Sequence, residues 1–411
     1  MRIAVVDGFS MSPVLVQELA QRGAECVHVC TRPNFSEFHT RSFDPTVYAA
    51  DLGYAGDAPA AAEAVRALGV DAVIPGAESG VILADKIAEA LGLVGNGITR
   101  SHARRDKVAM AKVVHDTGLA APSGRLVSSA GEAAEWFAAN GSRPVVVKPL
   151  ASAGTDGVRV CRTAEQARHA CENVLGHVDL LGATNHRALV QDYLDGDEYI
   201  VNTVTLGGVH KVVEVWRCTK YQDQAGSPIY DHHQAVPRGD AVGEAVVAYT
   251  KQAITALGIE HGAGHSEVMM TSTGPVLVET GARLMGTVLP WVHAKYSGSS
   301  HVHLYATALT DPDAFLAFDD EAVRWSHVLR QVYLFNNRAG VAEPDDWQES
   351  LRSLDTFVAL STNITPGAPV PQTVDLVSIP GHVYLAADSL KDIERDHAEI
   401  RAMESAGIYV G

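Results

Sequence analysis

The sequence is poor in cysteine and has no long apolar run. Its five cysteines form no C-x-x-C pair, which argues against a disulfide framework and indicates reduced thiols. No apolar span of 18 residues occurs, and the N-terminus lacks a charged segment followed by an apolar run. We therefore expect a cytoplasmic protein without a membrane span.

Positive charge is also scarce. The chain has 32 Lys and Arg against 49 Asp and Glu, and its net charge is −17. Such a balance, with no cluster of basic residues to offset it, disfavours nucleic acid and anionic membranes as partners. It does not exclude a nucleotide substrate, because a local site can still be basic.

Two common phosphate-binding motifs are missing as well. No G-x-G-x-x-G follows the first apolar run, so dinucleotide binding is not expected, and no Walker A sequence indicates a P-loop fold. What the chain does have is a hydrophobic content of 46% with 20% charged residues, which is ordinary for a globular protein. Its 411 residues indicate two to four structural units.

Short apolar runs and helical patterns alternate along the first hundred residues. Residues 2–8, 25–30 and 70–75 are predicted as strands, with a helix between the first two. This β-α-β order indicates a parallel, doubly wound α/β sheet. Glu78 follows the last of these strands, at the edge where such sheets bind ligands. The alternative is an acid that stabilises the beginning of the next helix.

The middle of the chain places a lysine at the end of a buried strand. Lys148 nearly closes the apolar run 144–149, and a loop of small residues, 151–157, follows it. Backbone N–H groups of such a loop and the lysine ammonium can hold phosphate groups together. The alternative is a plain hairpin with a lysine whose stem lies along apolar surface.

The segment 261–286 predicts a β-hairpin that carries two facing acids. Apolar and polar residues alternate on both sides of 272–274, which we expect to form a three-residue loop. The expected facing pairs are Glu267 with Glu279, Val268 with Val278, and Met270 with Val276. Two carboxylates about 5 Å apart repel each other, and Mg²⁺ prefers such oxygens together with phosphate. Both acids could instead lie solvated on an exposed sheet face.

These features occur in the order found in ATP-grasp ligases, which the sequence resembles over nearly its whole length. The features are Lys107, Lys148 with its loop, the strand-to-linker segment 191–194, Glu198, Glu267, Glu279 and Arg283. Within that superfamily, the sequence is most similar to the L-amino acid ligases. The segments that indicate this are 6–10, 75–81, 195–199, 264–267 and 279–283.

The resemblance implies an α/β ATP-grasp fold with two flanking domains. We expect an N-terminal parallel-sheet, Rossmann-like domain over 1–100 and a C-terminal α+β domain over 311–411. Between them we expect an ATP-grasp lid subdomain over 101–188 and a catalytic subdomain over 189–310.

The resemblance also implies which residues bind ATP and metal. The cofactor-binding set is Lys107, Lys148, Ser152, Gly154, Gly157, Gln191, Tyr193, Leu194 and Glu198. The two lysines would contact the phosphates, the loop 151–157 would close over them, the backbone of 192–194 would hold adenine, and Glu198 would hold ribose. Glu267 and Glu279 would bind Mg²⁺, with Mn²⁺ as an alternative.

Two positions depart from the family pattern. Many ATP-grasp enzymes have Glu where Gln191 stands, and a metal-binding Asn where Gly281 stands. The first change leaves adenine binding intact, because that binding is largely through backbone. The second removes a protein ligand, so water or phosphate oxygens would have to complete the metal's coordination.

The resemblance implies an ADP-forming ligase. In this family the γ-phosphoryl group of ATP is transferred to a carboxylate, and an amine then attacks the acyl phosphate. We expect an enzyme that joins an amino acid, or a related carboxylate, to an amine or a second amino acid. The alternatives are a carboxylase or purine-pathway-type ligase that uses bicarbonate or formate, and a nucleotide-binding module without catalysis. Small-molecule substrates are expected, and a homodimer is left open.

Arg283 and His265 are the catalytic candidates. The guanidinium fork of Arg283 suits the transferring phosphoryl group or an oxyanion, and a salt bridge to a neighbouring acid is the alternative. His265 is expected to orient an amino acid substrate, and a core histidine is the alternative. We predict a loop over 216–238 that lines the amine pocket, with Lys220 and Tyr230, together with Glu78, as substrate-binding candidates.

Overall fold

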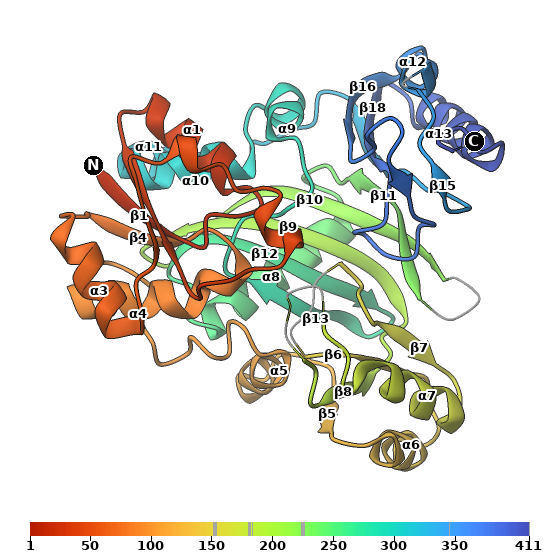
Figure 1. Ribbon diagram of the computed structural model, residues 1–411, viewed down its shortest axis with the longest axis horizontal. Coiled ribbons are helices and arrows are strands. Elements are labelled where there is room, and N and C mark those ends of the chain that lie inside the picture. The colour runs from red at the N-terminus through yellow and green to blue at the C-terminus, as the bar shows by residue number, and fades with distance from the viewer. Residues whose placement is uncertain (151–153, 180–181, 183, 223–226, 345, 411) are drawn as a thin grey trace.

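The N-terminal part of the computed structural model is built on a parallel four-stranded sheet (Figure 1). The structure describes residues 1–411 except 151–153, 180–181, 183, 223–226, 345 and 411. The strand order in this N-terminal sheet is β3 (Ala50–Tyr54), β2 (Glu25–Cys30), β1 (Arg2–Val6) and β4 (Ala72–Pro75). The sheet confirms the predicted parallel arrangement.

Both faces of the N-terminal sheet are buried, which explains the continuous apolar run in β1. Ile3 and Val5 pack with α1 (Ser12–Gln21), whereas Ala4 and Val6 pack with α3 (Ala58–Ala67) and α4 (Val81–Leu91). Short elements complete this part, namely α2 (Glu37–Thr40), η1 (Pro45–Val47) and η2 (Glu78–Gly80). Glu78 lies just after β4, at the carboxyl edge of the sheet.

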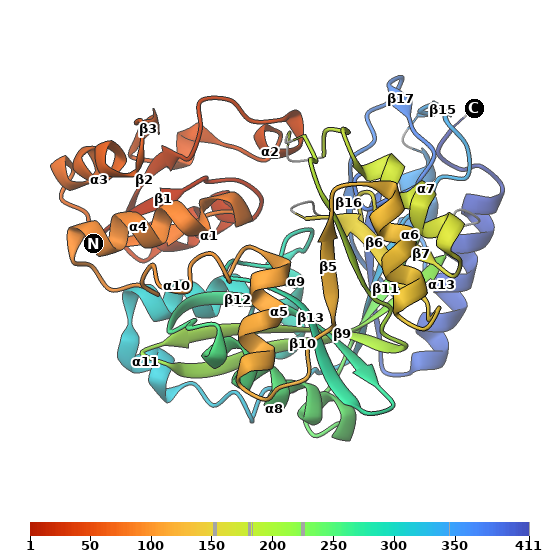
Figure 2. The same cartoon turned by 90° about the horizontal axis from the view of Figure 1, so that it is seen from below.

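A small antiparallel sheet follows α5 (Lys107–Asp116). Its order is β5 (Gly124–Val127), β8 (Ala188–Asp192), β6 (Val145–Pro149) and β7 (Arg159–Cys161). Helices α6 (Ala130–Ala139) and α7 (Ala164–Val174) share one apolar core with these strands. Figure 2 shows the N-terminal sheet and the small sheet on either side of α5.

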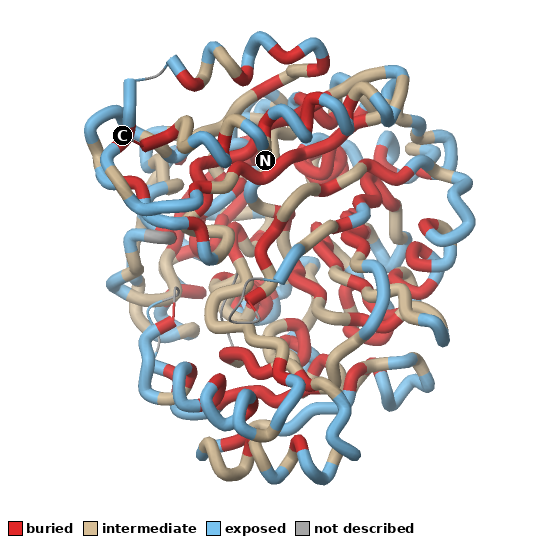
Figure 3. The backbone as a smooth tube through the Cα atoms, turned by 90° about the vertical axis from the view of Figure 1, so that its right-hand side faces the viewer, coloured by how far each residue is buried: buried red, intermediate tan, exposed pale blue. Residues whose placement is uncertain are grey.

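An eight-stranded antiparallel sheet, the large sheet, forms the centre of the molecule. Its order is β13 (Gly274–Gly281), β12 (His261–Thr271), β9 (Gly196–Leu206), β10 (Val209–Gln222), β11 (Pro228–Ala235), β14 (Val328–Tyr333), β18 (Gly381–Ala387) and β16 (Phe357–Thr362). The remaining elements are α8 (Ala241–Ala256), α9 (Pro290–Ser297), α10 (His301–Thr310), α11 (Pro312–Ala317), α12 (Asp346–Arg352), α13 (Leu390–Ser405), β15 (Gly340–Val341) and β17 (Pro369–Val370). Buried backbone, red in Figure 3, gathers in the interior of the molecule.

The strand pairing crosses two of the expected domain boundaries. The boundary at 188/189 falls inside β8, which pairs with β5 and β6 in the small sheet. The boundary at 310/311 separates β14, β18 and β16 from strands of the same large sheet. The division of the chain into four folding units therefore stays a prediction.

The loop predicted over 216–238 is wrong over most of its length. β10 continues to Gln222 and β11 begins at Pro228, with Lys220 paired to Tyr230 across the two strands. β10 also pairs with β9, and β11 with β14. These long-range pairings impose strand structure on a segment whose own composition favours a loop.

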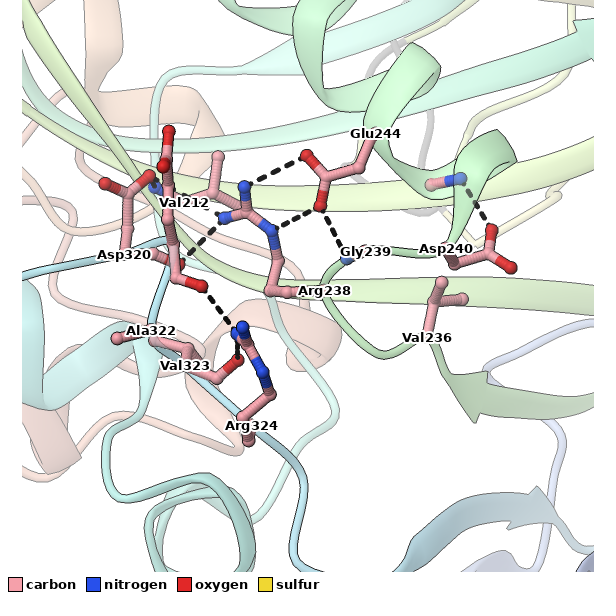
Figure 4. A network of polar contacts seen from close by, with 12 residues as sticks. Val212, Val236, Arg238, Gly239, Asp240, Glu244, Asp320, Ala322, Val323 and Arg324 are labelled. Atoms are coloured by element: carbon pink, nitrogen blue, oxygen red, sulfur yellow. Dashed lines mark hydrogen bonds and ion pairs between the residues drawn. The ribbon is translucent and has the colours of Figure 1, made fainter.

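A charged network fixes α8 and the 320 region to the large sheet (Figure 4). Arg238 binds Glu244 of α8 through Nε at 2.8 Å and donates to the Asp320 carbonyl at 2.8 Å. The buried Asp320 carboxylate accepts from the backbone N–H of Val212 at 3.0 Å and from Lys251 at 3.2 Å.

Among the described residues, no helix combines the length and the apolar character needed to cross a bilayer.

Candidate active site

A cavity of about 390 Å³ lies between the small sheet and the large sheet. Its walls come from β6, β8, β9, β10, β11 and the β12–β13 hairpin, so segments far apart in sequence meet there. The predicted site residues that line it are Lys107, Lys148, Gly154, Gln191, Tyr193, Leu194, Glu198, Lys220, Tyr230, Glu267 and Glu279. The fold thus gathers most of the predicted ligand-binding set around one cavity.

Four other predicted residues do not line the cavity, namely Gly157, His265, Arg283 and Glu78. Gly157 has φ +66°, and a Cβ there would lie 2.9 Å from Pro149 Cγ. Both the backbone conformation and the close approach of Pro149 therefore favour glycine at this position. His265, Arg283 and Glu78 lie beyond the two hairpin glutamates and contact other side chains. Ser152 lies outside the described residues.

The hairpin glutamates face each other, although the predicted register near the turn is wrong. Glu267 pairs with Glu279 as predicted, but the loop has two residues, because Thr271 pairs with Gly274. The pairs that replace the predicted ones are Val268 with Leu277 and Met270 with Pro275. A register shift between Glu267 and Val268 absorbs one extra residue and restores the pairing of the acids.

Each hairpin glutamate has a cationic or polar neighbour. Glu279 Oε2 lies 2.6 Å from Lys107 Nζ, and Glu267 Oε1 lies 3.8 Å from His265 Nε2. Burial alone raises the pKa of Glu267, but His265 and Lys220 together lower it far below its usual range. Glu267 is therefore ionised at neutral pH. Burial lowers the pKa of Lys107, and its ion pair with Glu279 more than offsets this, so Lys107 stays charged.

Lys148 differs from the other cavity lysines because, among the described residues, no carboxylate lies within ion-pair distance of it. Its side chain is buried. Burial and the nearby charge of Lys107 lower the pKa of Lys148 to about 8. A buried ammonium without a carboxylate partner gains from an anion in the cavity, since unpaired buried charge is costly.

Lys220 forms an ion pair with Glu198 in the wall of the cavity. Its Nζ lies 2.6 Å and 2.8 Å from the two carboxylate oxygens of Glu198, and 4.3 Å from the centre of the Tyr230 ring. Burial lowers the pKa of Lys220, but Glu198 raises it well above its usual range. The acid predicted to hold ribose is thus already held by a lysine from β10.

Glu78 and Arg283 form an ion pair between the N-terminal sheet and the end of β13. Arg283 Nε donates to Glu78 Oε2 at 2.9 Å, and Arg105 Nη1 contacts the other oxygen of Glu78. Burial raises the pKa of Glu78, but Arg105 and Arg283 lower it to about 2. The salt bridge considered as an alternative for Arg283 is therefore present in the structure.

The Glu78–Arg283 pair also accounts for Gly281. A Cβ on Gly281 would lie 2.6 Å from Glu78 Oε2 and 3.2 Å from Arg283 Nε. The space that an asparagine side chain would enter is filled by the carboxylate of Glu78. A residue with a side chain at position 281 would therefore clash with Glu78.

The sequence analysis missed Arg105 and Asn202. Asn202 lies in the buried middle of β9, and its Oδ1 is 2.9 Å from His265 Nδ1. An asparagine inside an apolar strand is unfavourable unless its amide is hydrogen-bonded, and that is the signal that could have identified Asn202. Arg105 carried no local signal, because it meets Glu78 only in the fold.

Comparison with known proteins places the chain in a family. The family model of the ATP-grasp domain matches residues 141–290. The whole chain is 31% identical to the dapdiamide A synthase of Enterobacter agglomerans and covers 97% of it. The chain belongs to the ATP-grasp family. The fold that the sequence predicted is thereby confirmed.

Two solved structures share this ATP-grasp fold. The L-amino acid ligase from Bacillus licheniformis has a TM-score of 0.73 and 19% identity, with 98% of this chain and 97% of that chain covered. The N5-carboxyaminoimidazole synthase from Aspergillus clavatus, in complex with ADP and 5-aminoimidazole ribonucleotide, has a TM-score of 0.69 and 13% identity, with 98% of both chains covered. At these identities the likeness concerns the fold alone.

The donor set of this ATP-grasp chain fits a divalent cation. Glu267 and Glu279 present hard carboxylate oxygens to the same cavity from paired positions on two strands. Lys107, which also lines the cavity, lies with its Nζ 2.6 Å from Glu279 Oε2. Two carboxylates and a charged lysine suit a metal that is also bound by phosphate oxygens.

Proposed function

We propose that this protein is an ATP-dependent carboxylate–amine ligase. It joins an amino acid, or a related carboxylate, to an amine or a second amino acid, and releases ADP and phosphate. The observation that carries the proposal is the pairing of Glu267 with Glu279 in a cavity that also holds Lys107 and Lys148, the latter with no carboxylate at ion-pair distance among the described residues. The 31% identity to a dapdiamide A synthase over the whole chain supports it.

ATP is proposed to lie along the cavity between the two sheets. Lys148 and Lys107 contact the phosphates, and the loop with Ser152, Gly154 and Gly157 closes over them. Gly154 supports this role, because its carbonyl accepts from the N–H of Leu376 at 3.2 Å and so joins the loop to the C-terminal part. The backbone of 192–194 holds adenine, and Glu198 holds ribose while Lys220 keeps the carboxylate in place.

Glu267 and Glu279 are proposed to hold Mg²⁺, with Mn²⁺ as an alternative. A bound divalent ion neutralises charge on the phosphates and helps to orient them for transfer. Gly281 offers no side-chain ligand, so phosphate or water oxygens would have to complete the coordination of a bound ion.

The reaction proceeds in two displacements. A carboxylate oxygen of the first substrate attacks the γ-phosphorus of ATP, the bond to the ADP oxygen breaks, and an acyl phosphate forms. The amine nitrogen then attacks the acyl carbon, the bond to the phosphate oxygen breaks, and phosphate leaves with its electron pair and takes up a proton from the amine. Positioning and charge neutralisation are the main requirements of the first step.

Arg283 is proposed to stabilise charge on the transferring phosphoryl group or the tetrahedral oxyanion. Its Nε and Nη1 are bound by Glu78 and by the Leu284 carbonyl, so its direction is fixed. We propose that Glu78 positions this arginine. Lys220 and Tyr230 shape the cavity wall, and the cytoplasmic location and the homodimer stay predictions.

The test is a matrix of amino acids and amines assayed for ADP release. The proposed function requires ADP release that depends on both a carboxylate and an amine, with a new amide product. Release with bicarbonate or formate alone would favour the carboxylase or purine-pathway alternative. ATP binding without ADP release across the whole matrix would favour a binding module.

A further inference from the structure

A second cavity, of about 490 Å³, lies where α13 packs beside β11 and β14. Its walls come from β10, β11, β14 and α13, and α13 is dark blue in Figure 1. Tyr221, near the end of β10, lines both this cavity and the one proposed for ATP. No residue proposed above to bind ATP, metal or substrate lines the second cavity.

Arg330 of β14 brings a positive charge to the wall of the second cavity. The residue is only 6% exposed. Its Nε donates to Gln234 Oε1 at 2.9 Å, and its Nη1 donates to His397 Nδ1 at 3.1 Å, because arginine has no acceptor. Among the residues that the structure describes, no carboxylate lies within ion-pair distance of Arg330, and its Nη2 has no hydrogen-bond partner. Buried charge without a counter-charge is costly, so this guanidinium gains from a bound anion.

Two acids of the same cavity are already paired and do not compensate Arg330. Asp231 Oδ1 accepts from Arg401 Nη2 at 2.8 Å, and Asp231 Oδ2 lies 2.7 Å from His232 Nδ1. Glu404 Oε2 accepts from Arg401 Nη1 at 2.6 Å. Arg401 therefore holds both carboxylates and leaves the charge of Arg330 without a contact partner.

The same contacts disfavour a metal ion at this place. Asp231, His232 and His397 offer ligand atoms that lie within 4.8 Å of one another. However, Arg401 donates to Asp231, and Arg330 donates to His397. A divalent cation held by these three residues would stand beside two guanidinium groups and be repelled by both.

Glu394 of α13 offers the cavity a negative charge. Its side chain is exposed, it lines the cavity, and no ion pair involves it in the described part of the chain. Burial lowers the pKa of Arg330, and the charges of Glu394 and Asp231 raise it, so both acids lie near this arginine without contacting it. The cavity thus presents one uncompensated cation and one uncompensated carboxylate.

Two aromatic rings complete the wall. The ring centres of Tyr221 and Phe335 lie 5.7 Å apart in an edge-to-face arrangement, and both residues line the cavity. Such rings provide apolar surface for the uncharged part of a ligand. A cavity of this volume holds a small molecule and is too small for a folded partner.

We propose that the second cavity binds a small zwitterion, an α-amino acid or a short peptide with free ends. Arg330 binds its carboxylate, since a guanidinium fork suits a carboxylate better than other anions of one charge. The ammonium group lies toward Glu394, and the apolar part lies against Tyr221 and Phe335. This binding goes beyond the proposed function, because it occurs outside the cavity proposed for ATP and needs no turnover.

The first test is calorimetric titration of L-phenylalanine and of glycyl-L-phenylalanine into wild type, Arg330→Met and Glu394→Gln. A site elsewhere in the chain contributes equally in all three proteins, so the difference between them measures the second cavity. We expect each variant to weaken this binding at least about tenfold, because a charge-assisted contact is lost. The tighter ligand of the two identifies whether the natural occupant is an amino acid or a peptide. Equal binding in all three proteins would overturn the inference.

The second test removes one charge from the ligand at a time. N-acetyl-L-phenylalanine keeps the carboxylate and has no ammonium group, so its binding should weaken in Arg330→Met and stay the same in Glu394→Gln. Phenethylamine has no carboxylate and should show no binding that depends on Arg330. Phenethylamine binding that is lost in Arg330→Met would overturn the assignment of the carboxylate to this arginine.

Glu399→Gln is the matched control. Glu399 lies on the same helix as Glu394, is also exposed, and does not line the cavity. We expect this variant to bind both ligands as wild type does. Glu394→Gln changes an exposed residue and should fold, so the inference stays testable if Arg330→Met does not. Absence of ADP release in wild type would refute the proposed function, whereas equal binding in all variants would refute only this inference.

Discussion

Arg283 Nε donates to Glu78 Oε2 at 2.9 Å, although 205 positions separate the two residues in the sequence. The contact joins the carboxyl edge of the N-terminal sheet to the end of β13, two residues after Gly281. It fixes the arginine proposed for phosphoryl transfer, which stands four residues after Glu279, one of the two acids proposed to bind the metal.

Gly281→Ala should lower kcat by about ten- to a hundredfold, because small displacements of positioned groups are costly in catalysis. The new Cβ would stand 2.6 Å from Glu78 Oε2 and push the Glu78–Arg283 pair apart. Steady-state kinetics checks this, with Gly131→Ala as the control, since a Cβ there meets only Ser129 Oγ at 3.8 Å. Unchanged kcat in Gly281→Ala would contradict the positioning role of the pair.

Glu279→Gln should reduce phosphate release at least about a hundredfold, because it removes charge stabilisation from the transfer step. The fold should persist, since Glu279 is only partly buried. Phosphate release and circular dichroism check the two parts of this prediction. Glu165→Gln, on the exposed side of α7, is the control. Near-normal turnover in Glu279→Gln would rule out the metal assignment.

Binding of metal-free ATP should weaken as the pH rises through about 8, where Lys148 loses its charge in the free protein. The sign follows from the lowered pKa: the charged form that attracts phosphate is complete below this value and is lost above it. Lys148→Arg should bind ATP with little change over the same range, since arginine stays charged. Calorimetric titration measures this, with adenosine as a ligand without phosphate. An equal pH dependence in Lys148→Arg would contradict the assignment.

Glu78→Gln should destabilise the protein at neutral pH and much less in acid. The folded pKa of about 2 lies below the ordinary 4.5, so the stability contributed by Glu78 is complete above 4.5 and is lost as the pH falls toward 2. The difference in urea midpoint between wild type and Glu78→Gln should therefore shrink over this range. A difference that stays constant with pH would show that the ion pair with the two arginines is not its source.

Local pattern predicted the elements of the site better than their register. The alternation around Glu267 and Glu279 was sufficient to pair the two acids. The two-residue loop at 272–273 and the shift after Glu267 could not be seen, because one extra residue in a strand changes no composition. The wrong loop length and the missed register shift compensate each other at Glu267 and Glu279, so that pair is correct. The pairs nearer the turn are wrong by one residue.

Contacts between distant segments account for what the sequence did not show. Lys220 was expected on a loop, but it lies in β10. This strand pairs with β9 and β11, β11 pairs with β14, and the sheet brings Lys220 to Glu198 of β9. Arg105 meets its partner Glu78 only in the folded chain. A charged residue whose partner is remote in sequence gives no periodic signal, so its role is settled only in three dimensions.

The most direct test of the account is a crystal structure with a non-hydrolysable ATP analogue and Mn²⁺, whose anomalous scattering locates the metal. The account predicts a metal peak between the carboxylates of Glu267 and Glu279, with the phosphates on Lys148. A metal bound elsewhere, or a triphosphate outside this cavity, would contradict it.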